Sequence, residues 1–290
     1  MIIDGHAHFI NREIAKEIVK DNKRFDDLSV DEGKKLWLGA MDKNGVEKTV
    51  FMGVSSGNKI FTEFINSSDR FIGISNVNPI EKNAVKKLDK DIKDGYKGLK
   101  LYPTARAFDV SDERAYKVYD YCEKKKLPIV IHFGVSIGEN TDLRYGNPVN
   151  LSPVVRDYPE VYFVIAHFGA GYLKEVLMLM YKRENVLFDT SGTNNWLDFS
   201  PFGWKLKDVF KIALKAIGSE RIIFGTDTVK IKEGYRERIL KEQIGICKRL
   251  LNRNEREDIF YNNAKRIFNV WESFKLLVIF NFCMKRGMYL

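Results

Sequence analysis

The chain has 290 residues, 44% of them hydrophobic and 30% charged, and its formal net charge is +9. This composition is typical of a globular protein with a sizeable core and excludes an intrinsically disordered chain. The basic residues are dispersed and alternate with acidic ones, as over residues 81–94, so the charge predicts a solvated basic surface and no specific nucleic-acid partner.

Eight short apolar segments recur along the chain, with amphipathic stretches between them. The segments are rich in Val, Ile, Phe and Tyr, which is typical of parallel strands buried on both faces. The predicted strands cover residues 1–8, 48–54, 71–78, 96–102, 128–133, 161–168, 186–190 and 221–227. The predicted helices include residues 83–94, 112–125, 173–183, 206–217 and 233–251, and the helix at 112–125 has Ser111 and Asp112 as capping residues.

Strands that alternate with helices form a parallel sheet. Eight such units fit a closed (β/α)8 barrel, which typically needs about 250 residues, although an open doubly wound sheet would show the same alternation. We predict an α/β fold, with a (β/α)8 TIM barrel over residues 1–270. Residues 271–290 leave the pattern and form a C-terminal tail without an assigned role.

Three cysteines, Cys122, Cys247 and Cys283, form neither a CxxC pair nor an even-numbered disulfide framework, which favours a reducing compartment. The N-terminus lacks the basic and apolar regions of a signal peptide. The longest apolar run, residues 276–283, is far shorter than the roughly 20 residues of a membrane span. We therefore expect a cytoplasmic protein without a membrane partner, either a monomer or a homo-oligomer.

All four histidines stand at the ends of predicted strands: His6 and His8 in HAH, His132 in IVIHFG and His167 in FVIAHFG. A single histidine in an apolar strand is usually a core residue, but four at strand ends need another explanation. Residues at i and i+2 share a face of a strand, and barrel active sites lie at the C-terminal face of the strands. Converging neutral imidazoles would leave buried lone pairs unsatisfied, so the pattern predicts a bound metal ion.

The eighth predicted strand ends in Asp227, which shares a face with Ile223 and Gly225. On its own this aspartate could cap a following helix. Beside four histidines, it is suited to bind the metal and to transfer a proton. Histidines and an aspartate around an open position form a hydrolytic metal site by their chemistry.

Together these segments resemble the amidohydrolase superfamily, specifically the branch of metal-dependent hydrolases that also holds the aminocarboxymuconate semialdehyde decarboxylases. The resemblance rests on IIDGHAHF, KGLKLYP, IVIHFG, FVIAHFG, VLFDTSG, IIFGTD and NNAKRIF, in this order from residue 1 to about residue 268. It implies a barrel, one or two divalent metal ions, usually zinc, and attack by a metal-activated water.

The resemblance also implies a role for each residue of the predicted site. His6, His8 and His132 would be metal ligands. His167 would be a further ligand in members with two metals, or would hydrogen-bond the metal-bound water in members with one. Asp227 would bind the metal and move the proton.

Lys100 in KGLKLYP is expected to point into the barrel, because its neighbours Leu99 and Leu101 suit the interface with the helices. Dihydroorotase-like members of the superfamily carboxylate a lysine in a similar setting. The carbamate would bridge two metals, one held by the first two histidines and one by the last two. Otherwise Lys100 stays an ammonium that pairs with Asp227, with another acidic side chain or with a substrate carboxylate.

Four residues near the predicted site are candidates for substrate binding: Tyr102, Arg106, Arg144 and Tyr145. The last two lie in the long segment 136–152. Either arginine would suit a carboxylate-bearing small molecule, because a guanidinium binds a carboxylate through two hydrogen bonds. A solvated surface position is the alternative for each.

We predict hydrolysis of a small amide, cyclic imide, lactone or ester. Non-oxidative decarboxylation of an unsaturated or aromatic acid at the same metal is the alternative. A TatD-like nuclease also begins with DxHxH, but it usually carries a glutamate where this chain has Lys100. A metal-stabilised scaffold without activity would not need an open ligand position.

Overall fold

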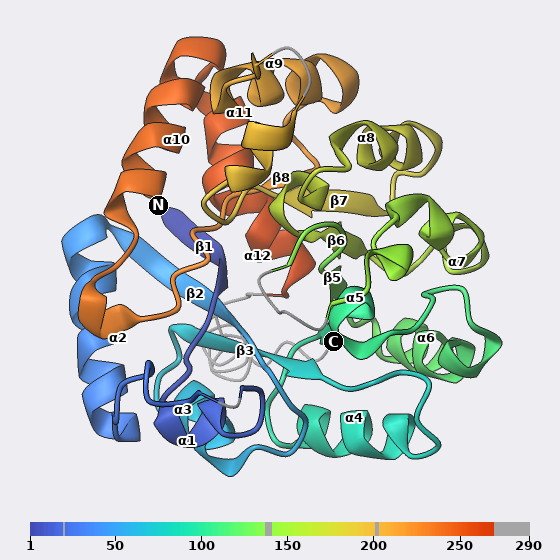
Figure 1. Cartoon of the computed structure of the whole chain (residues 1–290). Coiled ribbons are helices and arrows are strands. Elements are labelled where there is room, and N and C mark those ends of the chain that lie inside the picture. The colour runs from blue at the N-terminus through green and yellow to red at the C-terminus, as the bar shows by residue number, and fades with distance from the viewer. Residues whose placement is uncertain (20, 137–140, 201–202, 270–290) are drawn as a thin grey trace, which may run out of the picture.

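Eight parallel strands succeed one another in chain order around a barrel, with helices outside them (Figure 1). The computed structural model describes residues 1–19, 21–136, 141–200 and 203–269. The strands are β1 (Ile2–Ala7), β2 (Val46–Met52), β3 (Phe71–Asn76), β4 (Leu99–Leu101), β5 (Ile129–Ile131), β6 (Phe163–Ile165), β7 (Val186–Asp189) and β8 (Ile222–Ile223). The predicted (β/α)8 barrel is confirmed.

Backbone hydrogen bonds between β1 and the segment after β8 bring the two ends of the sheet together. The amide of His8 donates to the carbonyl of Thr228 over 2.8 Å, and the amide of Asp227 donates to the carbonyl of His6 over 2.7 Å. An isolated parallel bridge joins Ala7 to Thr228. The sheet therefore curls round on itself, which an open doubly wound sheet does not do.

The helices lie between consecutive strands and follow the predicted amphipathic stretches. At the start of α6, the side chain of Asp112 accepts a hydrogen bond from the amide of Arg114 over 2.9 Å, as predicted for a cap. The α-helices are α1 (Arg12–Ala15), α2 (Val30–Asn44), α3 (Lys59–Asn66), α4 (Ala84–Lys93), α5 (Pro103–Arg106), α6 (Glu113–Lys125), α7 (Ser152–Asp157), α8 (Leu173–Lys182), α9 (Leu206–Ile217), α10 (Glu237–Leu250), α11 (Arg253–Glu257) and α12 (Asn263–Ile267). Shorter helical turns are η1 (Leu143–Tyr145), η2 (Pro148–Leu151), η3 (Ala166–Gly169), η4 (Asn195–Phe199), η6 (Ile231–Glu233) and the π-helical η7 (Asp258–Asn262).

The apolar core has two parts, one between the strands and the helices and one inside the barrel. The inner part contains Val50, Val130 and Leu187 from the strands, together with Ile267 and Phe268 at the end of α12. In Figure 1, α12 lies across the middle of the ring of strands. Its residues pack against the beginnings of the strands, so α12 closes the end of the barrel that lies opposite the histidines.

The direction of the β1 side chains changes along the strand. Ile3 belongs to the inner core, whereas Ala7 belongs to the outer core, although simple alternation would place both on one face. The pairing of β1 with β2 is irregular between Asp4 and Ala7. An irregularity of this kind shifts the alternation by one residue, and it is what turns His6 inward.

Within the described ranges, no helix is long and apolar enough to cross a membrane. Cys122 and Cys247 are buried and form no disulfide. Cys283 and the predicted tail, residues 271–290, lie outside the described residues.

Candidate metal centre

The four histidines gather at the C-terminal ends of the strands and are referred to below as the histidine cluster (His6, His8, His132 and His167). The ring centroids of His6 and His8 are 5.4 Å apart, and those of His6 and His167 are 4.8 Å apart. His132 completes the cluster, because its ring centroid lies 4.7 Å from that of His167. Side chains from β1 and from the ends of β5 and β6 therefore converge at one place.

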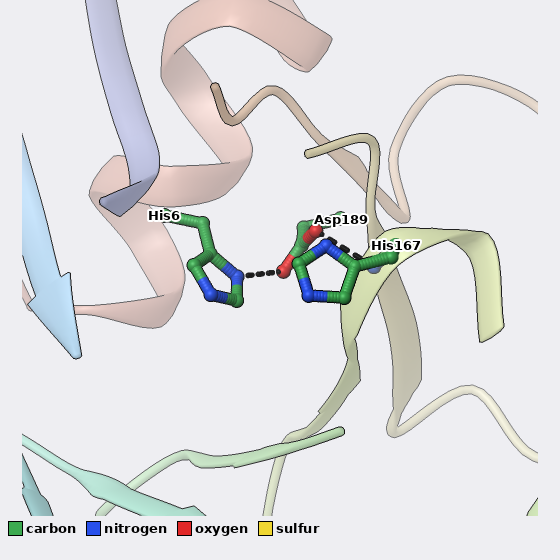
Figure 2. Close-up of side chains that lie close together, drawn as sticks. All are labelled: His6, His167 and Asp189. Carbon is green, nitrogen blue, oxygen red and sulfur yellow. Dashed lines mark hydrogen bonds and ion pairs between the residues drawn. The ribbon is translucent and has the colours of Figure 1, made fainter. Parts of the chain in front are cut away.

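Asp189, the last residue of β7, joins two members of the cluster (Figure 2). Its Oδ2 lies 2.7 Å from Nδ1 of His6. Its Oδ1 accepts hydrogen bonds from the amides of His167 and Ser191, each over 3.0 Å, and from the Ser191 hydroxyl. Burial favours the neutral acid, but the histidines and these hydrogen bonds hold the pKa of Asp189 below its usual value. Both carboxylate oxygens are thus occupied, and Asp189 orients the cluster.

The hydrogen bonds of His6 and His8 fix which ring nitrogen carries the proton. Nδ1 of His6 faces the Asp189 carboxylate, and Nδ1 of His8 lies 3.2 Å from the carbonyl oxygen of Met52. Both partners are acceptors, so each Nδ1 carries the hydrogen and each Nε2 keeps a lone pair. Nε2 of His6 is buried without a hydrogen-bond partner, which is the unsatisfied state that a metal ion would relieve.

The two remaining histidines are held in a similar way. Nδ1 of His167 lies 2.8 Å from the hydroxyl of Ser191, which itself donates to Asp189. Nε2 of His132 lies 3.1 Å from the carbonyl oxygen of Val135. In each ring one nitrogen is committed to the protein, and the other is left as an acceptor.

Burial keeps three of the four rings of the histidine cluster neutral. Burial, followed by the positive charge of Lys100, lowers the pKa of His6 to about 4. Burial and the neighbouring imidazole lower the pKa of His132 to about 3 and that of His167 to about 4. Since metals bind the neutral imidazole, these three rings are ready to act as ligands at neutral pH.

Asp227 faces the cluster from the segment after β8. Its Oδ1 lies 3.3 Å from Nε2 of His8, and its Oδ2 accepts a hydrogen bond from Arg236 over 3.0 Å. Burial raises its pKa, but the His8 contact and the nearby imidazoles outweigh this and hold the pKa well below its usual value. Asp227 has a φ of 56°, a left-handed conformation that few non-glycine residues adopt. Strained backbone of this kind is often found at functional sites.

Two groups of side chains in the described residues have the spacing of metal ligands: His6, His8 and Asp227, and His6, His167 and Asp189. The second group is poorly suited, because both oxygens of Asp189 already accept hydrogen bonds. In the first group, two imidazole lone pairs and one carboxylate oxygen meet. These donors fit a divalent ion such as zinc. His6 belongs to both groups.

Lys100 lies in the interior with no exposed surface. Its ammonium has no hydrogen-bond partner and stands 5.1 Å from the centroid of the Tyr102 ring. Burial lowers the pKa of Lys100 to about 8, and the charges of Asp189 and Asp227 only partly oppose this.

The predicted substrate-binding residues differ in their positions. Tyr102 is partly buried, and its ring centroid lies 6.0 Å from that of His132. Arg106 is exposed and donates to the carbonyl of Val54 over 3.3 Å. The side chain of Arg144 is 82% exposed and pairs with its neighbour Asp142, while Tyr145 lies beside it, with its ring centroid 5.8 Å from the guanidinium.

Sequence reasoning did not identify Asp189, Ser191 or Arg236 as part of the site. The signal for Asp189 was present, because it follows the inward-facing Leu187 by two residues and ends a strand, as Asp227 was expected to do. Ser191 and Arg236 act through contacts that only the folded chain brings together.

A family model described as amidohydrolase matches residues 3–270. The chain belongs to the amidohydrolase family. This confirms the resemblance read from the sequence motifs. No curated protein matches the chain.

Solved structures similar to this amidohydrolase include hydrolases and decarboxylases. A probable 2-pyrone-4,6-dicarboxylic acid hydrolase from Acinetobacter baumannii, with citric acid bound, has a TM-score of 0.69 and 18% identity, over 92% of this chain and 99% of that one. An amidohydrolase from Burkholderia multivorans with bound zinc has a TM-score of 0.64 and 14% identity, over 93% of this chain and 99% of that one. A 2,6-dihydroxybenzoate decarboxylase, complexed with 2,6-dihydroxybenzoate, has a TM-score of 0.67 and 14% identity, over 93% and 98%.

These similarities establish the barrel fold for the amidohydrolase. By their names, one of these neighbours is a probable hydrolase and another is a decarboxylase. The choice between the two depends on the residues of the site.

Proposed function

We propose that this amidohydrolase is a metal-dependent hydrolase of a small amide, cyclic imide, lactone or ester. The observation that carries the proposal is that ligand atoms of His6, His8 and Asp227 lie within 4.8 Å of one another, with Nε2 of His8 3.3 Å from Oδ1 of Asp227. His6, His8 and Asp227 would hold a divalent ion, most simply zinc, which would supply Lewis acidity and lower the pKa of a water molecule. His132 and His167 are proposed as further ligands or as hydrogen-bonding partners of the reacting groups.

Asp227 is the proposed general base. Its low pKa keeps it ionised at neutral pH, so it can accept a proton from the attacking water and pass that proton to the leaving group. Arg236 holds Oδ2 and thereby orients the carboxylate. Asp189 holds the ring of His6 and the backbone of His167, so the cluster does not have to rearrange during the reaction.

The proposed substrate is small and carries a carboxylate. Two similar structures contain citric acid and 2,6-dihydroxybenzoate, both organic acids. Tyr102, beside His132, is proposed to contact the substrate. Arg106 follows it after one turn of helix, and Arg144 and Tyr145 are proposed to form the outer rim.

Decarboxylation of an unsaturated or aromatic acid is the second candidate. The likeness to a 2,6-dihydroxybenzoate decarboxylase favours it, with a TM-score of 0.67 over 93% of the chain. The same donors would serve this reaction, because it also needs a positive charge beside the substrate carboxylate.

The deciding experiment offers one panel of substrates to the zinc-loaded protein and to protein stripped with a chelator. The panel contains lactones, amides, cyclic imides and esters, together with aromatic and unsaturated acids, and both hydrolysis and CO2 release are measured. We expect hydrolysis that disappears on chelation and returns with zinc. Release of CO2 without hydrolysis would favour the decarboxylase instead.

Plasmid DNA in the same panel tests for a nuclease. We expect weak binding that salt abolishes, as dispersed surface charge gives, and no cleavage. Metal-dependent cleavage of the plasmid would favour the TatD-like alternative.

The free, buried Cys122 and Cys247 fit the proposed cytoplasmic location.

A further inference from the structure

Lys100 is a buried cation without a counter-ion. Its side chain is fully buried, and no described group accepts a hydrogen bond from its ammonium. The ammonium lies over the face of the Tyr102 ring, with Nζ 5.1 Å from the ring centroid. A buried, unpaired ammonium is costly, because the interior solvates the charge far less well than water does. Such a cost is retained where a ligand supplies the missing anion.

The lysine lies directly below the histidine cluster. In the sheet, Lys100 pairs with Asn76 on one side and with Val130 on the other. Val130 belongs to the inner core and precedes His132 by two residues. Because inward-facing side chains repeat every two residues along a strand, Lys100 lies one layer of side chains below the histidines in the barrel interior. A substrate carboxylate bound at the inner end of the histidine cluster would therefore come close to this ammonium.

Neither nearby carboxylate is available to Lys100. Asp189 uses both oxygens to orient His6, His167 and Ser191. Asp227 directs Oδ1 at His8 and Oδ2 at Arg236. Together these two carboxylates offset only the charge of one divalent ion, so the charge of Lys100 would remain.

A carbamate on Lys100 would use the lysine in another way, as a bridge between two ions. The donors of the described chain do not favour it, because both groups with metal-ligand spacing include His6. Two ions held by these groups would have to share the His6 imidazole, whose Nδ1 already faces Asp189. One ion at His6, His8 and Asp227 needs no bridging carbamate.

We infer that Lys100 remains an ammonium and binds a carboxylate of the substrate, which makes it a specificity-determining residue for small organic acids. This inference rests on the proposed function for the identity of the reaction, but not for the binding of the anion. The reacting bond of the substrate should then lie close to the substrate carboxylate, because Lys100 is only one layer of side chains below the histidines. A neutral analogue would leave the ammonium unpaired and would bind poorly.

The test uses Lys100→Met, which keeps the length of the side chain and removes its charge, with Lys97→Met as a matched control. Lys97 leads into the same strand but is exposed. We expect Lys100→Met to raise the melting temperature of the ligand-free protein, because it removes a buried charge, and Lys97→Met to leave it unchanged. Lys100→Gln replaces Lys100→Met if the methionine variant does not fold.

Binding is measured by calorimetry with acetate and benzoate as probes, and with acetamide and benzamide as their neutral counterparts. Hydrogen bonds to charged groups contribute about 1.5–3 kcal/mol, so the Kd of at least one carboxylate should rise about 10- to 100-fold in Lys100→Met and stay unchanged in Lys97→Met. Binding of the amides should not depend on the lysine. If neither carboxylate binds less tightly to Lys100→Met than to the wild type, or if that variant melts at a lower temperature, the inference is wrong.

Zinc content distinguishes the remaining explanations. We expect one zinc per chain in the wild type and in Lys100→Met, with or without bicarbonate. Two ions in the wild type that fall to one or none in the variant would establish the carbamate and overturn the inference. If the wild type binds no zinc but still prefers carboxylates through Lys100, the proposed metal-dependent function fails and the role of Lys100 stands.

Discussion

Nδ1 of His6 lies 2.7 Å from Oδ2 of Asp189, and both side chains are almost completely buried. The two residues come from β1 and β7, so this hydrogen bond reaches across the mouth of the barrel. It fixes the orientation of the His6 ring and leaves Nε2 without a hydrogen-bond partner among the described residues. A carboxylate behind a metal-binding imidazole also makes the imidazole a stronger donor.

Asp189→Asn should therefore weaken zinc binding about 10- to 100-fold, the usual effect of removing such a partner. The amide keeps the shape of the carboxylate, but it loses one of the two oxygens that accept these hydrogen bonds. Competition with a chelator measures the affinity. Asp198→Asn changes an exposed aspartate on η4 and should have no effect. Equal affinities in the two variants would remove Asp189 from the site.

Replacing His6 and His8 together by alanine should abolish zinc binding and activity, because two of the three nitrogen and oxygen donors disappear. Metal analysis after dialysis measures the first effect, and circular dichroism checks that the barrel has formed. Wild-type protein stripped with a chelator should behave in the same way and recover with zinc. A double variant that keeps a full equivalent of zinc and normal turnover would show that the ion binds elsewhere.

Asp227→Asn keeps one oxygen that could bind the metal, but the neutral amide is too weak a base to take a proton from water. We expect turnover to fall by about 10² to 10⁴, which is the usual contribution of a general acid–base group. The melting temperature and the zinc content should stay close to those of the wild type. An unchanged rate would assign Asp227 a structural role at the end of the barrel.

Gly225 has no side chain, and this absence makes room for His6. A Cβ at this position would lie 2.9 Å from the Cβ atoms of His6 and Ser191. Gly225→Ala should therefore displace His6, weaken zinc binding and destabilise the protein by about 1–3 kcal/mol, as overpacking does.

Gly39→Ala is the control: a Cβ there meets no atom within 4 Å, and Gly39 lies inside α2. That change should stabilise the protein by about 0.5–1 kcal/mol, as a denaturant titration would measure. Equal effects of both changes would contradict the role of Gly225.

The barrel could be predicted from the sequence because its strands are apolar on both faces and its helices are amphipathic. The helix predicted at 206–217 is α9 with the same bounds, and those predicted at 112–125 and 173–183 differ from α6 and α8 by one residue. The eighth strand was predicted as 221–227, but β8 is only Ile222–Ile223. Asp227, four residues beyond β8, has a left-handed conformation that does not occur within a regular strand.

The four histidines, Lys100 and Asp227 stand at or just after strand segments that the sequence identifies, so their gathering near the C-terminal ends of the strands could be predicted. The reason that His6 faces inward could not. Alternation from Ile3 would have turned it toward the helices, and only the irregular pairing of β1 with β2 corrects this. His167 likewise sits in a left-handed turn after β6, with a φ of 58°. Features of this kind depend on the register of neighbouring strands, which a single sequence does not reveal.

The seam between β1 and the segment after β8 has a consequence for how the chain folds. The carboxylate of Asp4 accepts a hydrogen bond from the amide of Thr226, which lies 222 positions further along the chain. His6 and His8 meet Asp227 at the same seam, so the ion-binding site is complete only after the last strand has joined the first. An ion held there would link two segments that are separated by a very long loop. The entropic cost of closing a loop is greatest for the longest loops. A partly synthesised chain that ends before Asp227 would lack one of the proposed ligands, so ion binding at the proposed site would report that the barrel has closed.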